Sequence, residues 1–502
     1  MDLVTEDAAL AAAATAGGTE HFDVLIVGAG ISGVGSAKHL KDQTPGKSFV
    51  VLEALEGFGG TWLSHRYPGI RSDSDLYTFG YRFKPWVGPP IALAEEIRKY
   101  MGEVIAENDL GRHIRYGHKV RSASWSSADN LWTLVAEGPG GVEARFTCGF
   151  LWMCQGYYRH QEGYTPEWEG MEAFKGVIAH PENWPADLNY AGKRVVIIGS
   201  GATAATMAPA MADTAAHVTV LQRSPTYFIA QPNHNEFMEL LKPLGLDEHL
   251  VHEIVRRKVV VDFDAITRRC FEEPDVVAAE LLAGLEAFIG PEEVKKHFTP
   301  TYRPWRQRIA ILPDGDMMQE IQKNRVSMVT DHIDRFVPEG ILLKSGQVVE
   351  ADVIATATGF NLSVLGDIAF SVDGEPLAFN ETVTYRGTMF TGVPNMAWVF
   401  GYFRNSWTLR TELIADFVCR LLNHMDDKGA HRVDVVLRRE DHNMPRLPFI
   451  DPDNFNAGYV MRGLSLLPQR GDKPEWQHTQ DYWWEKDAFP AIDLDGEEFR
   501  YG

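Results

Sequence analysis

Glycines near the N-terminus have the spacing of a turn that binds a dinucleotide. Gly28, Gly30 and Gly33 lie between the apolar run DVLIV and a stretch with helical spacing, and Glu53 ends the next apolar run. In such a turn the glycines permit a tight bend, close approach of a pyrophosphate and close packing of the helix, whose N-terminus attracts phosphates. Glu53 can hydrogen-bond an adenosine ribose but would repel a 2′-phosphate. The pattern predicts FAD or NAD here and excludes NADP; a glycine-rich connection without a ligand is the alternative.

A second glycine-rich loop follows soon after Glu53. The sequence GFGGTW contains Gly60, Thr61 and Trp62, and a flavin-binding lobe needs such a second approach to its cofactor. Disulfide reductases of similar design carry a redox cysteine pair near this point, whereas residues 61–64 here are TWLS. The loop therefore disfavours that class and favours a flavin site, with a plain surface loop as the alternative.

The same kind of turn occurs again in the middle of the chain, with a different ending. GSGATA follows the apolar run RVVIIG, and the next run, HVTVLQRS, ends in an arginine and a serine instead of an acid. A guanidinium and a hydroxyl can neutralise and hydrogen-bond a 2′-phosphate, so this site is predicted to bind NADPH. An arginine solvated at the end of a strand is the alternative. The predicted cofactor residues are Gly199, Gly201, Ala202, Thr203, Ala204, Arg223 and Ser224.

Two such turns require two parallel sheets, each with helices beside it. The expected fold class is α/β, with two Rossmann-like dinucleotide-binding domains and a helical insertion in the second. Strand-like runs between the two turns predict a small antiparallel layer. The predicted organisation is a flexible extension over 1–21, an FAD-binding domain over 22–160, an NADPH-binding domain over 161–385 with its insertion at about 233–300, and the rest of the FAD-binding domain over 386–502.

Composition and charge exclude several classes of binding partner. The net charge of −21 would repel phosphate backbones, so no nucleic-acid partner is expected. The four cysteines form no CxxC pair, which indicates neither disulfides nor a zinc knuckle and favours the cytoplasm. No apolar run is long enough to span a membrane, so no integral membrane segment is expected. His249, His252 and Glu253 have helical spacing but form no HExxH motif, and no metal is predicted.

The segment between the two turns is the most distinctive part of the sequence. FKGVIAHPENWP contains Phe174, Gly176, His180 and Trp184. It resembles the FxGxxxHxxxW fingerprint of type I Baeyer-Villiger monooxygenases, which are class B flavoprotein monooxygenases. The similarity covers almost the whole chain from Phe22. It is closest to the subgroup containing the ethionamide-activating monooxygenase, in the stretches RYPGIRSDSDLYTFGY, CQGYYRHQEGYTPEW, YRPWRQR and GYFRNSWTLR.

The resemblance implies an activity and site residues that spacing alone does not. Members of this family use FAD, NADPH and O2 to convert ketones to esters or lactones through a C4a-peroxyflavin, and sulfide or thioamide oxidation is an expected side activity. The catalytic arginine and aspartate of the family match Arg308 and Asp73 here. A guanidinium stays charged at any working pH and can stabilise a peroxide anion, and the aspartate would hold it in place. His180 and Trp184 are expected to act as a hinge between lobes rather than in bond making.

Two other functions are compatible with the sequence. A flavin-containing monooxygenase acting mainly on sulfur or nitrogen is one alternative, although Trp184 and Arg308 argue against it. A flavin-binding sensor without turnover is another. Gln307 stands where many family members have a lysine that helps to hold the 2′-phosphate, which leaves more of that role to Arg223 and Ser224. The expected partners are a small ketone or sulfide and O2.

Overall fold

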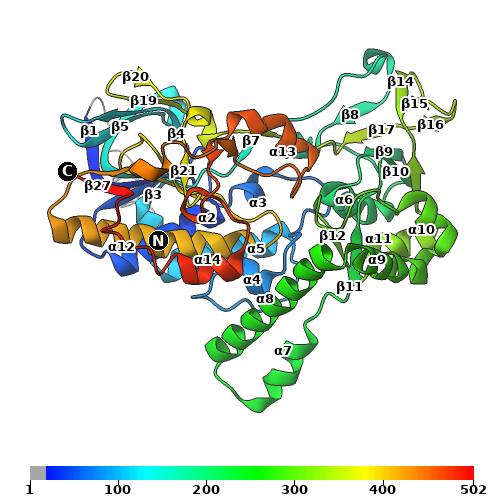
Figure 1. Ribbon diagram of the computed structural model, residues 1–502. Coiled ribbons are helices and arrows are strands. Elements are labelled where there is room, and N and C mark those ends of the chain that lie inside the picture. Colours follow the sequence, from blue (N-terminus) through cyan, green and yellow to red (C-terminus); the bar gives the residue numbers. More distant parts are fainter. Residues whose placement is uncertain (1–17) are drawn as a thin grey trace, which may run out of the picture.

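The computed structural model describes residues 18–502. It has two lobes that lie side by side in Figure 1, each built around its own sheet. The predicted extension over 1–21 falls mostly outside the described residues, and the first strand begins at Thr19. None of the helices within residues 18–502 is long and apolar enough to cross a membrane.

The first lobe contains a mixed sheet with the order β20-β19-β4-β5-β6-β1-β2-β3, and β23 also pairs with β6. Its strands are β1 (Thr19–Val27), β2 (Phe49–Leu52), β3 (Ile114–Arg115), β4 (Lys119–Ser126), β5 (Leu131–Glu137), β6 (Glu143–Met153), β19 (Ala369–Val372), β20 (Glu375–Pro376) and β23 (Met396–Trp398). Strand β1 pairs in parallel with β2 and β6, and both of its faces are covered, which explains its continuous apolar run.

The antiparallel layer predicted between the two turns is present, but it is not separate. Strands β4, β5 and β6 are antiparallel to one another. Because β6 also pairs with β1, the layer continues the first sheet. The C-terminal ends of β1 and β6 therefore lie next to each other. This is the edge of a parallel sheet where ligands bind.

The second lobe contains a fully parallel sheet with the order β13-β10-β9-β17-β8. Its strands are β8 (Val177–Ala179), β9 (Arg194–Ile198), β10 (His217–Gln222), β13 (Val326–Thr330) and β17 (Val353–Thr356). Helix α6 (Ala202–Ala212) follows β9, as helix α2 (Ile31–Gln43) follows β1. The α/β architecture predicted from the two glycine turns is confirmed.

Helices fill the range predicted as an insertion. They are α7 (Glu236–Leu241), α8 (Glu248–Glu272), α9 (Pro274–Ile289) and α10 (Pro291–His297). Helices α7 and α8 form the arm that projects from the body of the molecule in Figure 1. Helix α9 packs on the second lobe, whereas α8 reaches α4 (Leu76–Phe79) of the first. The insertion therefore spans both lobes.

The chain returns to the first sheet earlier than the sequence suggested. Strand β19 pairs in parallel with β4, so the chain has rejoined that sheet well before residue 386, where the boundary was predicted. Because the apolar run of β19 is short, its sequence shows no clear strand periodicity. Helix α12 (Trp407–Lys428) then packs along α2 and completes the first lobe.

A buried arginine fastens α8 to the first lobe. Arg256 donates hydrogen bonds to the carbonyl oxygens of Tyr77, Thr78 and Gly80 and forms an ion pair with Glu412 of α12 at 2.8 Å. Both charged side chains are at least nine-tenths buried. Removing one partner of such a pair leaves an uncompensated charge in the interior.

Arg256→Met is therefore expected to lower the free energy of unfolding by about 3–5 kcal/mol. Arg257→Met on the same helix is the matched control, because Arg257 is exposed and, among residues 18–502, forms an ion pair with Glu253 alone. Its expected cost is below about 1 kcal/mol. Urea-induced unfolding followed by tryptophan fluorescence measures both, and equal effects of the two substitutions would contradict this role of Arg256.

Candidate active site

The first glycine turn is packed so tightly that side chains would not fit. Gly28 has φ +102°, and a Cβ there would lie 2.7 Å from the carbonyl oxygen of Cys154 at the end of β6. A Cβ on Gly33 would lie 1.8 Å from the carbonyl oxygen of Gly28. These contacts bring the N-terminus of α2 against the ends of β1 and β6, as the spacing predicted.

The second glycine-rich loop closes over the first turn. The Gly59 N–H donates to the carbonyl oxygen of Ala29 at 3.0 Å. A Cβ on Gly60, which has φ +56°, would lie 3.1 Å from the Cα of Gly30. Two backbones therefore face each other without side chains between them, and α3 (Thr61–Ser64) begins at once. The close approach of the two backbones favours glycine at both positions.

Glu53 is buried at the end of β2 and is bound by backbone. Its carboxylate accepts hydrogen bonds from the N–H groups of Ala29, at 2.6 Å, and Leu55, at 2.8 Å. Burial raises the pKa of Glu53, and these N–H donors partly offset the rise. Each carboxylate oxygen keeps acceptor capacity for a further donor such as a ribose hydroxyl. The side chain also lines the main cavity described below.

The second glycine turn is tightly packed at Gly199, next to β17, and open at Gly201, before α6. Gly199 has φ +130°, and a Cβ there would lie 2.3 Å from the carbonyl oxygen of Ala357. A Cβ on Gly201 would meet no atom within 4 Å, and Ala204 is buried in the lobe's core. Arg223 and Ser224 are exposed at the end of β10. Within residues 18–502, Arg223 makes no ion pair or side-chain hydrogen bond.

A large cavity lies between the two lobes. It is lined by both glycine-rich loops of the first lobe and by the start of α6 from the second. The predicted residues that line it are Gly28, Gly30, Glu53, Gly60, Thr61, Trp62, Asp73, Ala202, Thr203 and Arg308. Those that do not are Gly33, Phe174, Gly176, His180, Trp184, Gly199, Gly201, Ala204, Arg223 and Ser224. The cavity thus joins the first dinucleotide turn to the N-terminus of the second turn's helix.

Arg308 and Asp73 meet in this cavity although they are far apart in the sequence. Arg308 precedes β12 (Ala310–Pro313), and its Nε lies 2.6 Å from Oδ2 of Asp73 in the loop between α3 and α4. Its other nitrogens donate to the carbonyl oxygen of Phe403, at 3.0 Å, and to the Ser74 hydroxyl, at 3.4 Å. About a quarter of the Arg308 side chain stays exposed to the cavity. A fixed cation is thereby presented where the lobes meet.

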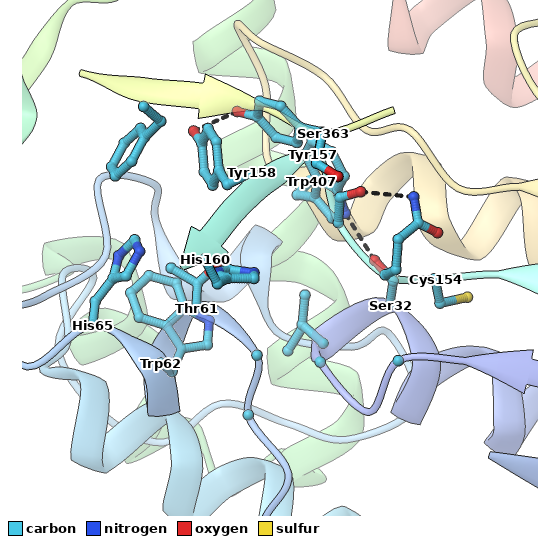
Figure 2. A pocket seen from close by; sticks show the side chains of 18 of the residues that line it. Ser32, Thr61, Trp62, His65, Cys154, Tyr157, Tyr158, His160, Ser363 and Trp407 are labelled. Carbon is cyan, nitrogen blue, oxygen red and sulfur yellow. Dashed lines mark hydrogen bonds between the residues drawn. The ribbon is translucent and has the colours of Figure 1, made fainter. Parts of the chain in front are cut away.

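Tyrosines that the sequence did not single out surround this cation. Tyr157 and Tyr158 follow the end of β6, and their hydroxyls are 2.6 Å apart. In the view of Figure 2 their side chains lie above those of Trp62 and His65. Loss of water lowers the pKa of Arg308, but the charge of Asp73 and these phenols, with Tyr459, raise it to a net value above normal. Their place after the end of a parallel strand was the signal available in the sequence.

The fingerprint residues lie beside the cavity, in the connection between the lobes. His180 accepts from the Glu182 N–H through Nδ1, at 3.1 Å, and donates through Nε2 to the carbonyl oxygen of Gly359, at 3.1 Å. Burial lowers the pKa of His180, which favours this neutral form. Phe174 packs in the apolar core behind β9 and β17, and Gly176 lies against the backbone of Asp352. These contacts hold the His180 ring in place, and none of the four fingerprint residues lines the cavity.

A histidine pair and a glutamate meet at one edge of the cavity. His65, His160 and Glu182 come from three segments, and their polar side-chain atoms lie within 4.8 Å of one another. The sequence predicted no metal site and singled out none of these residues. Because these residues are far apart in the sequence, no motif spacing indicated that they would meet.

Comparisons with known families agree with this arrangement. The Flavin-binding monooxygenase-like family matches residues 88–241. An NAD(P)-binding Rossmann-like domain matches residues 26–86, which contain the first glycine turn and Glu53.

Solved structures share the fold over nearly the full length. The oxidised steroid monooxygenase bound to NADP superposes with a TM-score of 0.75 at 22% identity, covering 96% of this chain and 99% of that one. Open cyclohexanone monooxygenase gives a TM-score of 0.72 at 19% identity, covering 96% and 100%.

Curated relatives are much closer in sequence. The FAD-containing monooxygenase EthA of Mycobacterium tuberculosis is 46% identical over 92% of this chain and 94% of its own length. The probable FAD-binding monooxygenase AlmA of an Acinetobacter species is 40% identical over 92% of this chain and 93% of its own. The family predicted from the fingerprint is thereby confirmed: the chain belongs to the flavin-binding, FAD-containing monooxygenases.

Proposed function

We propose that this monooxygenase inserts an oxygen atom beside the carbonyl group of a ketone, using NADPH and O2 and giving an ester or a lactone. The observation that carries the proposal is the Arg308–Asp73 pair, which presents a fixed cation in the cavity shared by the two lobes. Sulfide or thioamide oxidation is the expected side activity.

The first glycine turn fits FAD. Gly30 and Gly60 line the cavity with main chain that a pyrophosphate can approach closely, and Glu53 keeps acceptor capacity for a ribose hydroxyl. Thr61 and Trp62 line the cavity beyond that point. When bound, FAD would accept a hydride from NADPH and activate O2 for transfer of one oxygen atom.

The second turn fits NADPH. Gly201 leaves open space before the N-terminus of α6, where a helix dipole and free N–H groups favour a pyrophosphate. Arg223 and Ser224 are exposed at the end of β10, in the place where a 2′-phosphate is recognised. Ala202 and Thr203 extend from this turn into the cavity.

Arg308 supplies electrostatic stabilisation. Negative charge develops on the oxygen that attacks a ketone, and a guanidinium that is already oriented stabilises this charge without reorganisation. Asp73 and the carbonyl oxygen of Phe403 orient it from two directions. Insertion beside a carbonyl needs an anionic oxygen, whereas sulfur is oxidised by an electrophilic one. Ester formation therefore depends more on Arg308 than sulfoxide formation does.

The test uses purified FAD-loaded protein with NADPH, O2 and a panel of linear, cyclic and aryl ketones and sulfides, with products identified by mass spectrometry. Esters or lactones support the proposal. Sulfoxides without any ester would establish oxidation of sulfur as the main reaction. Absence of NADPH oxidation with every compound would favour a flavin-binding sensor.

Arg308→Ala is expected to lower the rate of ester formation by about 100-fold or more, because removing one stabilising donor costs that much. Anaerobic flavin reduction by NADPH should persist, and sulfoxide formation should fall less than ester formation. Arg306→Ala is the matched control, since Arg306 is a half-buried arginine two residues away that does not line the cavity. An unchanged ester yield in Arg308→Ala would refute the assigned role.

Arg223→Ala is expected to raise the KM for NADPH by about 10-fold to 100-fold, the value of a charge-assisted hydrogen bond of about 1.5–3 kcal/mol. The KM for NADH should change little, because NADH lacks the 2′-phosphate. Arg335→Ala, at another exposed arginine of the same lobe, serves as control. Equal effects on both nucleotides would remove Arg223 from the 2′-phosphate site.

A further inference from the structure

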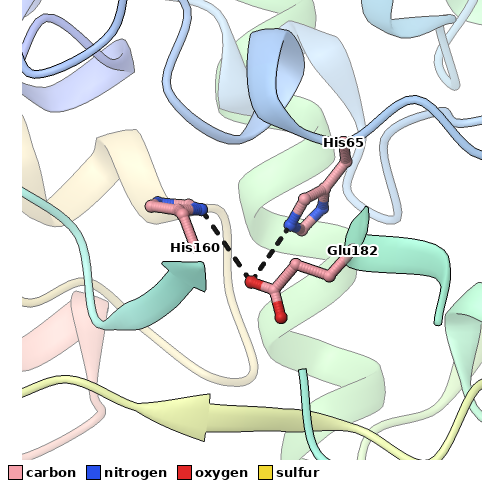
Figure 3. Close-up of side chains that lie close together, drawn as sticks. All are labelled: His65, His160 and Glu182. Atoms are coloured by element: carbon pink, nitrogen blue, oxygen red, sulfur yellow. Dashed lines mark ion pairs between the residues drawn. The ribbon is translucent and has the colours of Figure 1, made fainter. Parts of the chain in front are cut away.

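Two imidazoles converge on one carboxylate oxygen at the junction of the lobes. Nε2 of His65 lies 3.6 Å and Nδ1 of His160 lies 3.9 Å from the same Oε1 of Glu182 (Figure 3). His65 ends α3, His160 lies in β7 (Tyr158–Gly163), and Glu182 lies in the short turn η4 (Pro181–Asn183). Three separate segments thus aim ligand atoms at one point.

The carboxylate of Glu182 is buried without hydrogen bonds. Its side chain has no exposed surface, and neither oxygen has a hydrogen-bond partner within residues 18–502. Nε2 of His65 is likewise buried and without a partner there. A buried carboxylate without donors is costly, and proteins resolve that cost by pairing the charge or by coordinating a metal ion.

The distances suit coordination better than they suit direct pairing. Separations of 3.6 and 3.9 Å are too long for hydrogen bonds. Bonds of about 2.0–2.1 Å to a tetrahedral Zn²⁺ place neighbouring ligand atoms about 3.3–3.5 Å apart. Shifts of a few tenths of an ångström would bring each histidine–glutamate separation to that spacing, and the two imidazole nitrogens lie within 4.8 Å of each other. The His65 ring already stacks on Phe360, with centroids 5.4 Å apart and an interplanar angle of 7°.

We propose that His65, His160 and Glu182 bind one Zn²⁺ ion. Two imidazole nitrogens and a carboxylate oxygen select a borderline transition ion over Mg²⁺ or Ca²⁺, which prefer oxygen ligands. Three protein ligands leave the fourth position to a water molecule. His65 and His160 both line the cavity, and about a quarter of the His160 side chain is exposed, which provides an entry path.

The ion would connect three segments at the junction of the lobes, namely the end of α3, β7 and η4. The segment with His65 belongs to the first lobe's cofactor loops, and Glu182 is two residues from His180 in the fingerprint. Zn²⁺ would therefore restrain the connection between the lobes. Amide hydrogen exchange in residues 158–163 and 177–185 should slow when the ion binds.

The test begins with FAD-loaded enzyme that has been treated with a chelator and desalted. Titration with ZnCl2 against a chromophoric zinc chelator is expected to give one Zn²⁺ per chain. Glu182→Gln and His160→Asn should each weaken binding by about 100-fold or more, since even residues behind the ligands are worth 10–100-fold. X-ray absorption at the zinc edge should show nitrogen and oxygen ligands at about 2.0–2.1 Å and no sulfur.

The matched control is His113→Asn, which removes a half-buried histidine of the first lobe that stacks on Phe49. It should bind Zn²⁺ as the wild type does. Zn²⁺ should also raise the melting temperature of the wild type but not that of His160→Asn, and an unchanged far-UV circular dichroism spectrum shows that this variant folds. Zinc binding equal in the wild type, Glu182→Gln and His160→Asn would overturn the proposal, as would no binding by the wild type.

Discussion

The orientation of one guanidinium depends on contacts from both halves of the molecule. Arg308 comes from the second lobe, and its partners Asp73, Ser74 and Phe403 belong to the first. Displacement of a charged group by about 1 Å at a reacting centre can cost 100-fold in rate. The orientation of Arg308 therefore depends on the relative position of the lobes.

Three contacts besides the Arg308–Asp73 ion pair fix that position. The RYPGIR segment of the first lobe packs on α6 so closely that a Cβ on Gly69 would lie 2.4 Å from that of Ala210. Arg71 in the same segment forms an ion pair with Asp316 of the second lobe. On another side, Arg256 binds helix α8 to the first lobe's backbone. The helical insertion thus serves as a brace between the lobes.

Features fixed by neighbouring residues were predictable from the sequence, and features made by distant segments were not. The glycine turns follow from spacing because each forbidden Cβ contact lies within or next to one strand–helix unit. The Asp73–Arg308 pair was expected only through family resemblance, since no periodicity links the two positions. The tyrosines beside Arg308 and the cluster at Glu182 depend on how loops from both lobes meet. The early return of β19 to the first sheet rests on a strand too short to show a pattern.

The fingerprint segment, which was expected to act as a hinge, is held in place by hydrogen bonds. Both ring nitrogens of His180 are engaged, one by the Glu182 N–H and the other by the carbonyl oxygen of Gly359. The Tyr164 N–H also donates to that same carbonyl oxygen, so β7, η4 and the end of β17 form one hydrogen-bonded unit. A rotation of the second lobe that breaks these bonds would leave buried polar groups without partners. Breaking these hydrogen bonds is therefore unfavourable, and His180 holds β7, η4 and the segment after β17 together through both of its ring nitrogens.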